Sequence, residues 1–316
     1  MATSDDVGRS ADAPEEIPPK GWLAAATRMK AEVKADHVTL MAAGVAFYGF
    51  LAIIPGLVAV VSVYGLFGDP DTVQARVEDM AGSLPEEARN LLVEQLEAIT
   101  GSSSSALTVG LVISLGAALW AASSGMGHLI EAVNLVYDED ESRGFAKLRG
   151  LALVLTLGAV VFGIAAIAAI TVWPAVVAAV DPPSPFGLLL RLAVWPVLAL
   201  GLSIALAVLY RYGPDRENAE WRWVSWGSGI AVLLWLVASI AFQFYAGNFG
   251  SYNETYGSLG AVVLLLMWLW ISAVATLVGA EINSQLELET ADDSTTGPER
   301  PMGSRGAEVA DRVTAS

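Results

Sequence analysis

Residues 150–180 read GLALVLTLGAVVFGIAAIAAITVWPAVVAAV and contain no charged side chain. A helix needs about 20 such residues to cross the hydrocarbon core of a bilayer, which is about 30 Å thick. Outside this stretch, the chain has five more charge-free runs, each of about 20 residues or more. They are Thr39 to Gly68, Ala106 to Ile130, Leu192 to Tyr210, Trp223 to Asn253 and Thr255 to Ala280. The six runs predict six transmembrane helices, at about residues 39–67, 106–134, 150–179, 188–210, 224–248 and 258–284.

The composition supports a membrane protein. Hydrophobic residues make up 54% of the 316-residue chain and charged residues only 16%, a balance outside that of soluble domains. The runs are continuously apolar, whereas the strands of a membrane barrel alternate apolar and polar residues. We therefore predict an all-α membrane protein, a polytopic bundle of about six transmembrane helices with short amphipathic helices at the interfaces. The absence of cysteine excludes disulfides.

The distribution of Lys and Arg predicts the orientation, because these residues concentrate in cytoplasmic loops. Three of them, Arg76, Arg89 and Arg191, fall on one side of the predicted bundle. Apart from the distant tail, the other side has eleven: Arg9, Lys20, Arg28, Lys30, Lys34, Arg143, Lys147, Arg149, Arg211, Arg216 and Arg222. We expect a multi-pass protein of the inner membrane with both termini in the cytoplasm. The net charge of −16 sums very different regions and does not describe one surface.

Four segments flank or interrupt the predicted spans. Residues 1–20 have no basic and apolar leader like that of a signal peptide and are predicted to be a disordered cytoplasmic N-terminus. Residues 21–38 repeat apolar side chains at helical spacing, which favours an amphipathic interfacial helix, although a solvated lead-in helix fits as well. Residues 69–105 contain a capping box, Ser83-Leu84-Pro85-Glu86, and predict an extracytoplasmic helical segment. Residues 289–316 have few large apolar side chains, which predicts a disordered cytoplasmic tail.

Polar residues inside a bilayer are costly, so the few that occur near the span ends are candidate functional residues. The second span ends with His128, Glu131 and Asn134, which are three residues apart and share a helix face. They could face a cavity, relaying a proton or binding a headgroup, or form an interhelical hydrogen-bond cluster. As a metal site they offer too few ligands.

The sixth span has polar residues at both ends. Asn253 and Glu254 precede it among tyrosines that are also typical of interfacial anchoring. Glu281 and Asn283 lie near its inner end, and Glu281 is a candidate partner for an Arg or His side chain, namely Arg149, Arg211 or His128. Together with His128, Glu131 and Asn134, these four residues form a candidate polar cavity. No nucleophile with a base, phosphate loop or metal motif is recognisable, so no catalytic residue, cofactor or metal site is predicted.

Several motifs resemble those of the YihY/BrkB family of prokaryotic inner-membrane proteins, historically labelled ribonuclease BN. They lie in Ala42–Tyr48 with Pro55, Trp120–Tyr137, Tyr210–Pro214, Trp221–Val224, Tyr252–Gly260 and Gly279–Asn283. The likeness covers about residues 25–288. It implies a six-helix inner-membrane protein with no established active site, and with suggested roles in the envelope or in transport of lipid-linked or anionic solutes.

These observations favour transport or handling of a lipid or an anionic solute, with membrane lipids as partners and no enzymatic activity. A non-transporting envelope scaffold that binds through residues 69–105 and the basic inner face is the alternative, and a membrane enzyme acting on lipid ranks third. The ribonuclease label conflicts with the residues, because RNA binding needs a cationic surface and stacking aromatic side chains. We therefore expect no nucleic-acid partner, and the sequence does not predict an oligomeric state.

Overall fold

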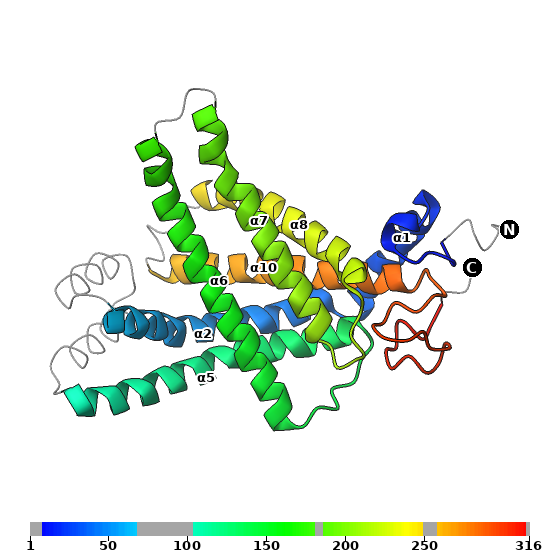
Figure 1. Ribbon diagram of the computed structural model, residues 1–316, viewed down its shortest axis with the longest axis horizontal. Coiled ribbons are helices and arrows are strands. Elements are labelled where there is room, and N and C mark those ends of the chain that lie inside the picture. The colour runs from blue at the N-terminus through cyan, green and yellow to red at the C-terminus, as the bar shows by residue number, and fades with distance from the viewer. Residues whose placement is uncertain (1–7, 68–103, 181–185, 249–257, 314–316) are drawn as a thin grey trace.

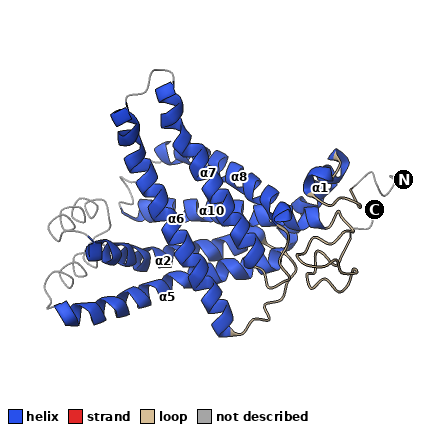
Figure 2. Cartoon of the chain, in the orientation of Figure 1, coloured by secondary structure: helices blue, strands red, loops and turns tan. Residues whose placement is uncertain are grey.

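The computed structural model describes residues 8–67, 104–180, 186–248 and 258–313. In these residues the secondary structure is helical, without a strand (Figure 2). The elements are the 3-10 helix η2 (Pro14–Glu16) and the α-helices α1 (Pro19–Ala35), α2 (Val38–Phe67), α5 (Ser104–Val136), α6 (Phe145–Val180), α7 (Phe186–Tyr212), α8 (Trp221–Asn248) and α10 (Ser258–Glu287). The predicted all-α fold class is confirmed.

Each of the six long helices, α2, α5, α6, α7, α8 and α10, covers one of the predicted spans. Within the described residues, α6, α7, α8 and α10 are long and apolar enough to cross a membrane, and the bent pair of α1 and α2 makes a fifth if it is one span. No more than 17% of the most apolar stretch of any of these four helices is buried. Such bare apolar surface is stable only in lipid. The exact count of six spans stays a prediction.

The long helices form a ring in which each packs against the next along the chain. α2 contacts α5, α5 contacts α6, and the series continues through α7 and α8 to α10, which returns to α2 and so closes the ring. The helices draw together where α1 and the C-terminal segment lie and spread apart toward the other end (Figure 1). We call the first of these the tail end of the bundle: α2, α6 and α8 begin there, and α5, α7 and α10 end there.

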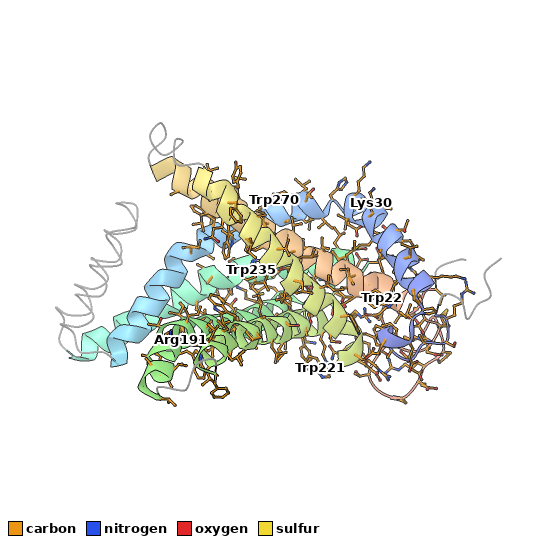
Figure 3. The ribbon with its side chains drawn as sticks, turned by 90° about the horizontal axis from the view of Figure 1, so that it is seen from above. Trp22, Lys30, Arg191, Trp221, Trp235 and Trp270 are labelled. Carbon is orange, nitrogen blue, oxygen red and sulfur yellow. The ribbon has the colours of Figure 1, made fainter. Side chains whose placement is uncertain are left out.

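The helices α1 and α2 are joined by a sharp bend, and α1 covers most of residues 21–38, for which the sequence predicts an interfacial helix. Pro19 begins α1, where its fixed φ angle suits the first turn. His37 has a left-handed φ of 51°, which ends the helix, and α1 meets the first part of α2 at 61°. The indole rings of Trp22 and of Trp226 in α8 are inclined by 67°, with centroids 5.4 Å apart, while Lys30 projects from the molecule (Figure 3).

A close crossing of α8 and α10 brings two glycines together. A Cβ atom at Gly279 would lie 2.5 Å from the Cβ of Ala231 and 2.7 Å from the carbonyl oxygen of Gly227. A Cβ at Gly227 would lie 2.1 Å from the carbonyl oxygen of Gly279. Only glycine at both positions permits this backbone contact, which sets how deeply the polar end of α10 enters the bundle.

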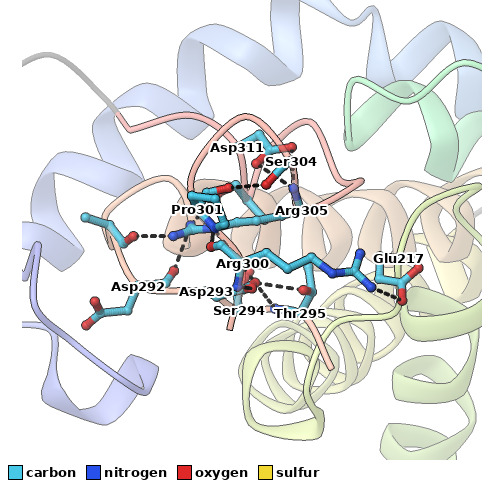
Figure 4. A network of polar contacts seen from close by, with 12 residues as sticks. Glu217, Asp292, Asp293, Ser294, Thr295, Arg300, Pro301, Ser304, Arg305 and Asp311 are labelled. Carbon is cyan, nitrogen blue, oxygen red and sulfur yellow. Dashed lines mark hydrogen bonds and ion pairs between the residues drawn. The ribbon is translucent and has the colours of Figure 1, made fainter. Parts of the chain in front are cut away.

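Residues 289–313 are ordered in the structure, whereas the sequence predicts a disordered tail over residues 289–316. Residues 288–313, called the tail here, fold back on the tail end of the bundle (Figure 1), where a network of polar contacts holds them (Figure 4). Val309 and Ala310 are buried. The guanidinium of Arg305 donates to the carbonyl oxygens of Ala291, Asp292 and Ala310 at 2.6, 3.0 and 2.7 Å. The prediction considered only the scarcity of apolar side chains, whereas main-chain hydrogen bonds and one buried arginine order the tail.

The tail also ties together segments that are distant in sequence. The backbone N–H of Glu220 donates to Ser294, and that of Glu217 donates to Gly306, which joins the α7–α8 turn to the tail. The N–H of Ala291 donates to the carbonyl of Arg9 at 2.8 Å. Residues 8–17 are thereby packed on the tail, with Ile17 only 4% exposed, and they too depart from the disorder predicted for residues 1–20.

Candidate functional site

A pocket of about 230 Å³ lies between α5 and α6, near the tail end of the bundle. It combines apolar and polar walls: Ser124, Gly127, His128 and Glu131 come from α5, and Phe145, Leu148, Arg149 and Ala152 from α6. We call it the interfacial pocket, because Arg149 and Phe145 belong to the first turns of α6, where the predicted span begins. It contains two of the candidate residues predicted from the sequence, His128 and Glu131.

His128 and Glu131 form a contact on one face of α5. The imidazole Nδ1 lies 3.1 Å from Oε2 of Glu131, as their spacing of three residues allows. The ring of Tyr48 in α2 stacks on the imidazole, with ring centres 3.6 Å apart and planes inclined by 22°. The side chains remain 35% and 53% exposed. The stacking fixes the ring while leaving the pair accessible from the pocket.

Arg149 is the cation of the interfacial pocket. Its guanidinium carbon lies 4.1 Å above the ring of Trp120, and this cation–π contact holds the side chain against α5. Nη2 donates to the hydroxyl of Ser124 at 3.1 Å and also to the carbonyl oxygen of Trp120. Neither hydrogen bond uses Nε or Nη1. The sequence placed Arg149 in a basic loop without indicating that it would lie beside His128.

Asn134 has a structural environment different from that of His128 and Glu131. It is 3% exposed and joins two turns at the tail end: its Nδ2 donates to Glu141 at 2.9 Å, and its Oδ1 accepts from the N–H of Asp215 at 2.7 Å. Arg143 chelates Glu141 through Nε and Nη2, at 2.7 and 2.6 Å, and these charged hydrogen bonds lower the pKa of that carboxyl. Asn134 thus locks the α5–α6 turn to the α7–α8 turn.

Asn283 is fully buried where α10 crosses α8. Its Oδ1 accepts from the N–H of Gly227 at 2.7 Å, and its Nδ2 donates to the carbonyl of Val224 at 3.3 Å. The amide of Asn283 therefore joins α10 to the backbone of α8, which is a structural role.

A buried ion pair that sequence reasoning missed lies beside Asn283. Nη2 and Nη1 of Arg216 donate to the carboxylate of Glu287 at 2.6 and 3.3 Å, and the side chains are 1% and 0% exposed. The hydroxyl of Ser294 donates to the same carboxylate at 2.9 Å. Arg216 also lies 5.1 Å from the ring centre of Tyr137, and burial raises the pKa of that phenol. A signal was present, since Glu287 follows Asn283 by four residues on one face of α10.

Glu281 does not contact the basic partners expected for it. Arg149 lies against Trp120, His128 lies against Glu131, and Arg211 donates to the carbonyl of Ala219. Glu281 is fully buried, and its Oε1 accepts instead from Nε2 of Gln285, one turn further along α10, at 3.0 Å.

The predicted polar residues therefore do not share one set of contacts. His128 and Glu131 line the interfacial pocket, whereas Asn134, Glu281 and Asn283 are buried in separate contacts at the tail end. Asn253 and Glu254 lie outside the described residues, as does the outer segment 69–105 apart from its last residues. Among the described residues, no group of three or more His, Asp or Glu side chains could hold a metal ion.

The ring of apolar helices with its polar groups gathered at one end defines a polytopic helical membrane protein. The sequence model of one protein family, described as virulence factor BrkB, matches residues 29–303, which is most of the chain. The chain therefore belongs to the BrkB family, as the motifs in the sequence predicted.

Relatives in other bacteria carry general names. A protein of Bacillus subtilis named ribonuclease-like protein YfkH is 28% identical over 251 residues, which cover 77% of this chain and 88% of the relative. A UPF0761 membrane protein of Chlorobium phaeobacteroides strain BS1 is 29% identical over 251 residues, or 78% of this chain. The match spans only 56% of that longer relative. No solved structure matches the chain.

Proposed function

We propose that this protein binds an anionic amphiphile, a phospholipid or a lipid-linked anion, in the interfacial pocket and transports or handles it in the inner membrane. The observation that carries the proposal is the position of Arg149. Its guanidinium lies over Trp120 beside the His128–Glu131 pair, in a pocket whose other wall is apolar. In this arrangement the tail end of the bundle faces the cytoplasm, as the distribution of basic residues predicts.

The two walls of the pocket suit the two parts of an amphiphile. A guanidinium donates charged hydrogen bonds to phosphate or carboxylate, and Nη1 of Arg149 lies outside its two internal hydrogen bonds, whereas Nε is buried. Phe145, Leu148 and Ala152 would contact the apolar part of the ligand. Phe145 is 73% exposed, which is costly in water but favourable against acyl chains.

The position near the membrane surface favours an anionic ligand. Lys147 and Arg149 lie in the first turns of α6, and basic pockets between transmembrane helices bind lipid headgroups at this depth. Glu131 is in contact with His128, whereas the hydrogen bonds of Arg149 in the described residues go to a hydroxyl and a main-chain carbonyl and not to a carboxylate. Arg149 is therefore the cation available to the ligand.

The packing of the tail end supports lateral entry from the bilayer over entry along the bundle axis. The α7–α8 turn, α10 and the tail are joined there by the buried Arg216–Glu287 pair and by Ser294. The interfacial pocket instead opens between two adjacent helices. A lipid could reach it without leaving the membrane.

The proposal does not extend the ribonuclease-like name of the Bacillus relative to this chain. An excess of 33 acidic over 17 basic residues opposes the phosphate neutralisation that RNA binding requires. The scaffold alternative depends on the outer segment 69–105, and no contact of the described residues favours it. We therefore propose a non-enzymatic role that centres on the interfacial pocket.

The test compares lipid retention and lipid movement in an Arg149→Gln variant. Native mass spectrometry of the purified full chain would count bound anionic and zwitterionic phospholipids, and vesicles containing a fluorescent anionic phospholipid would report movement between leaflets. Loss of the charged hydrogen bonds, worth about 1.5–3 kcal/mol, should weaken anionic-lipid binding by roughly ten- to a hundredfold. Binding of the zwitterionic lipid should change much less.

Arg222→Gln is the matched control. Arg222 also lies at the tail end, is 46% exposed and pairs with Glu220, but it does not line the pocket. This variant should bind anionic lipid like the native chain. Equal losses in both variants, or unchanged binding in Arg149→Gln, would show that the pocket does not select an anionic headgroup.

A further inference from the structure

Glu281 is a buried carboxyl group with an unsatisfied oxygen atom. The residue is fully buried in α10, and only Oε1 has a hydrogen-bond partner, Gln285. Within the part of the chain that the structure describes, Oε2 meets neither a donor nor an acceptor, and no ion pair includes this residue. Burying an ionised carboxylate without a counter-charge is far more costly than burying a neutral carboxylic acid.

The charged groups that influence Glu281 most are acidic. Asp36 has the largest electrostatic effect on it, followed by Glu32 of α1 and Asp138 at the end of α5. Other titratable or charged groups around this point are already engaged: Arg28 with Glu289, Arg216 with Glu287, Arg312 with Asp138, and Tyr137 beside Arg216. The other basic groups at the bend are Lys34, in the last turn of α1, and His37, which lies between α1 and α2 and acts on Asp36.

The contacts of Gln285 show why Arg28 does not neutralise Glu281. Arg28 Nε donates to Oε1 of Gln285 at 3.2 Å, and this orients the amide so that its Nε2 donates to Glu281 at 3.0 Å. Arg28 forms its ion pair with Glu289, and Gln285 lies between Arg28 and Glu281. The amide thus leaves Oε2 as the atom able to take a proton.

We infer that Glu281 is a proton-binding site, which carries a proton on Oε2 at a pH where carboxyls at the protein surface are ionised. Asp36 is the group placed to exchange that proton with solvent, because it is partly exposed at the α1–α2 bend and acts electrostatically on Glu281. Burial, with the nearby charges of Asp138 and Glu32, raises the pKa of Asp36 to about 6, which suits a group that exchanges protons near neutrality.

Proton release from Glu281 would act on the packing of α1. The apolar face of α1, with Trp22, Ala25 and Met29, borders a pocket of about 140 Å³ shared with Ile282 and Leu286 of α10. A charge on Glu281 would repel Asp36 and Glu32 and so favour separation of α1 from α10. This proton site lies in α10, whereas the interfacial pocket lies between α5 and α6, so one can exist without the other.

The experiment is infrared difference spectroscopy of the purified full chain in lipid nanodiscs, titrated from mildly acidic to alkaline pH. All samples carry Glu139→Gln, because burial raises the pKa of Glu139 to about 7 and its protonated carboxyl would absorb in the same region. In this background the chain should show a protonated-carboxyl band that persists at neutral pH, and the band should be lost when Glu281→Gln is added. The Glu217→Gln variant, at a residue whose side chain is 44% exposed, is the control and should retain the band. When Asp36→Asn is added, the band should disappear at a lower pH than without it, because a like charge has been removed.

Two results would overturn the inference. One is a band that stays unchanged when Glu281→Gln is added. The other is the Glu139→Gln chain, carrying isotopically labelled glutamate, that shows no label-shifted protonated-carboxyl band at neutral pH. The second measurement leaves Glu281 in place, so it decides the matter even if Glu281→Gln prevents folding.

Discussion

Replacing Arg216 by methionine should destabilise the protein strongly. The carboxylate of Glu287 is 0% exposed and accepts two hydrogen bonds from Arg216, so the substitution leaves it with the hydroxyl of Ser294. Removing one partner of a buried ion pair costs about 3–5 kcal/mol, because the remaining charge is not compensated. The expected loss exceeds that of any surface charge at the same end of the bundle.

The double variant Arg216→Met with Glu287→Met separates the charge from the packing. It removes both ions, so most of the stability should return, and the coupling between the two sites should be at least about 2 kcal/mol. Denaturant unfolding in detergent micelles would measure the free energies. Hydrogen exchange would follow the amides of Glu220 and Thr296, whose hydrogen bonds join the α7–α8 turn to the tail.

Arg222→Met is the control for this experiment, because the Arg222–Glu220 pair is 46% and 34% exposed and should contribute less than about 1 kcal/mol. If Arg216→Met and the double variant lose the same free energy, the uncompensated charge is not the cause of the loss. If Arg216→Met behaves like the control, the ion pair is not buried in the folded protein.

Three further predictions concern packing, pH and the tail. Gly279→Ala should cost on the order of 1–3 kcal/mol in unfolding experiments, because the new Cβ meets Ala231, whereas Gly229→Ala, with open space around it, should be neutral or stabilising. Burial raises the pKa of Glu139 from 4.5 to about 7. Its protonated form therefore favours the folded state, so the melting temperature should fall as pH rises through about 7, and Glu139→Gln should flatten that fall. Arg305→Ala, which removes four hydrogen bonds to main-chain carbonyls, should make the tail sensitive to limited proteolysis while the helices stay resistant; a tail that remains protected would contradict the ordering role of Arg305.

The sequence alone determined the fold class and the positions of the long helices. Charge-free runs such as residues 150–180 reflect a requirement that acts on every residue of a span: lipid offers no hydrogen bonds to polar groups, so the chain must be apolar and helical there. The motifs in the sequence also predicted the family, which the match to the BrkB family model confirms. The residues His128 and Glu131 could be paired in advance as well, because their contact follows from helical spacing alone.

The tertiary structure decided the rest, because those contacts join residues far apart in the chain. Helical spacing did not show that Tyr48 stacks on His128, that Arg149 lies over Trp120, or that Arg216 neutralises Glu287. The order of the tail likewise depends on carbonyls presented to Arg305 only after residues 291–310 have folded. Burial and counter-charge are properties of assembled helices, so whether a polar side chain is paired, satisfied or left to take a proton is settled only by packing.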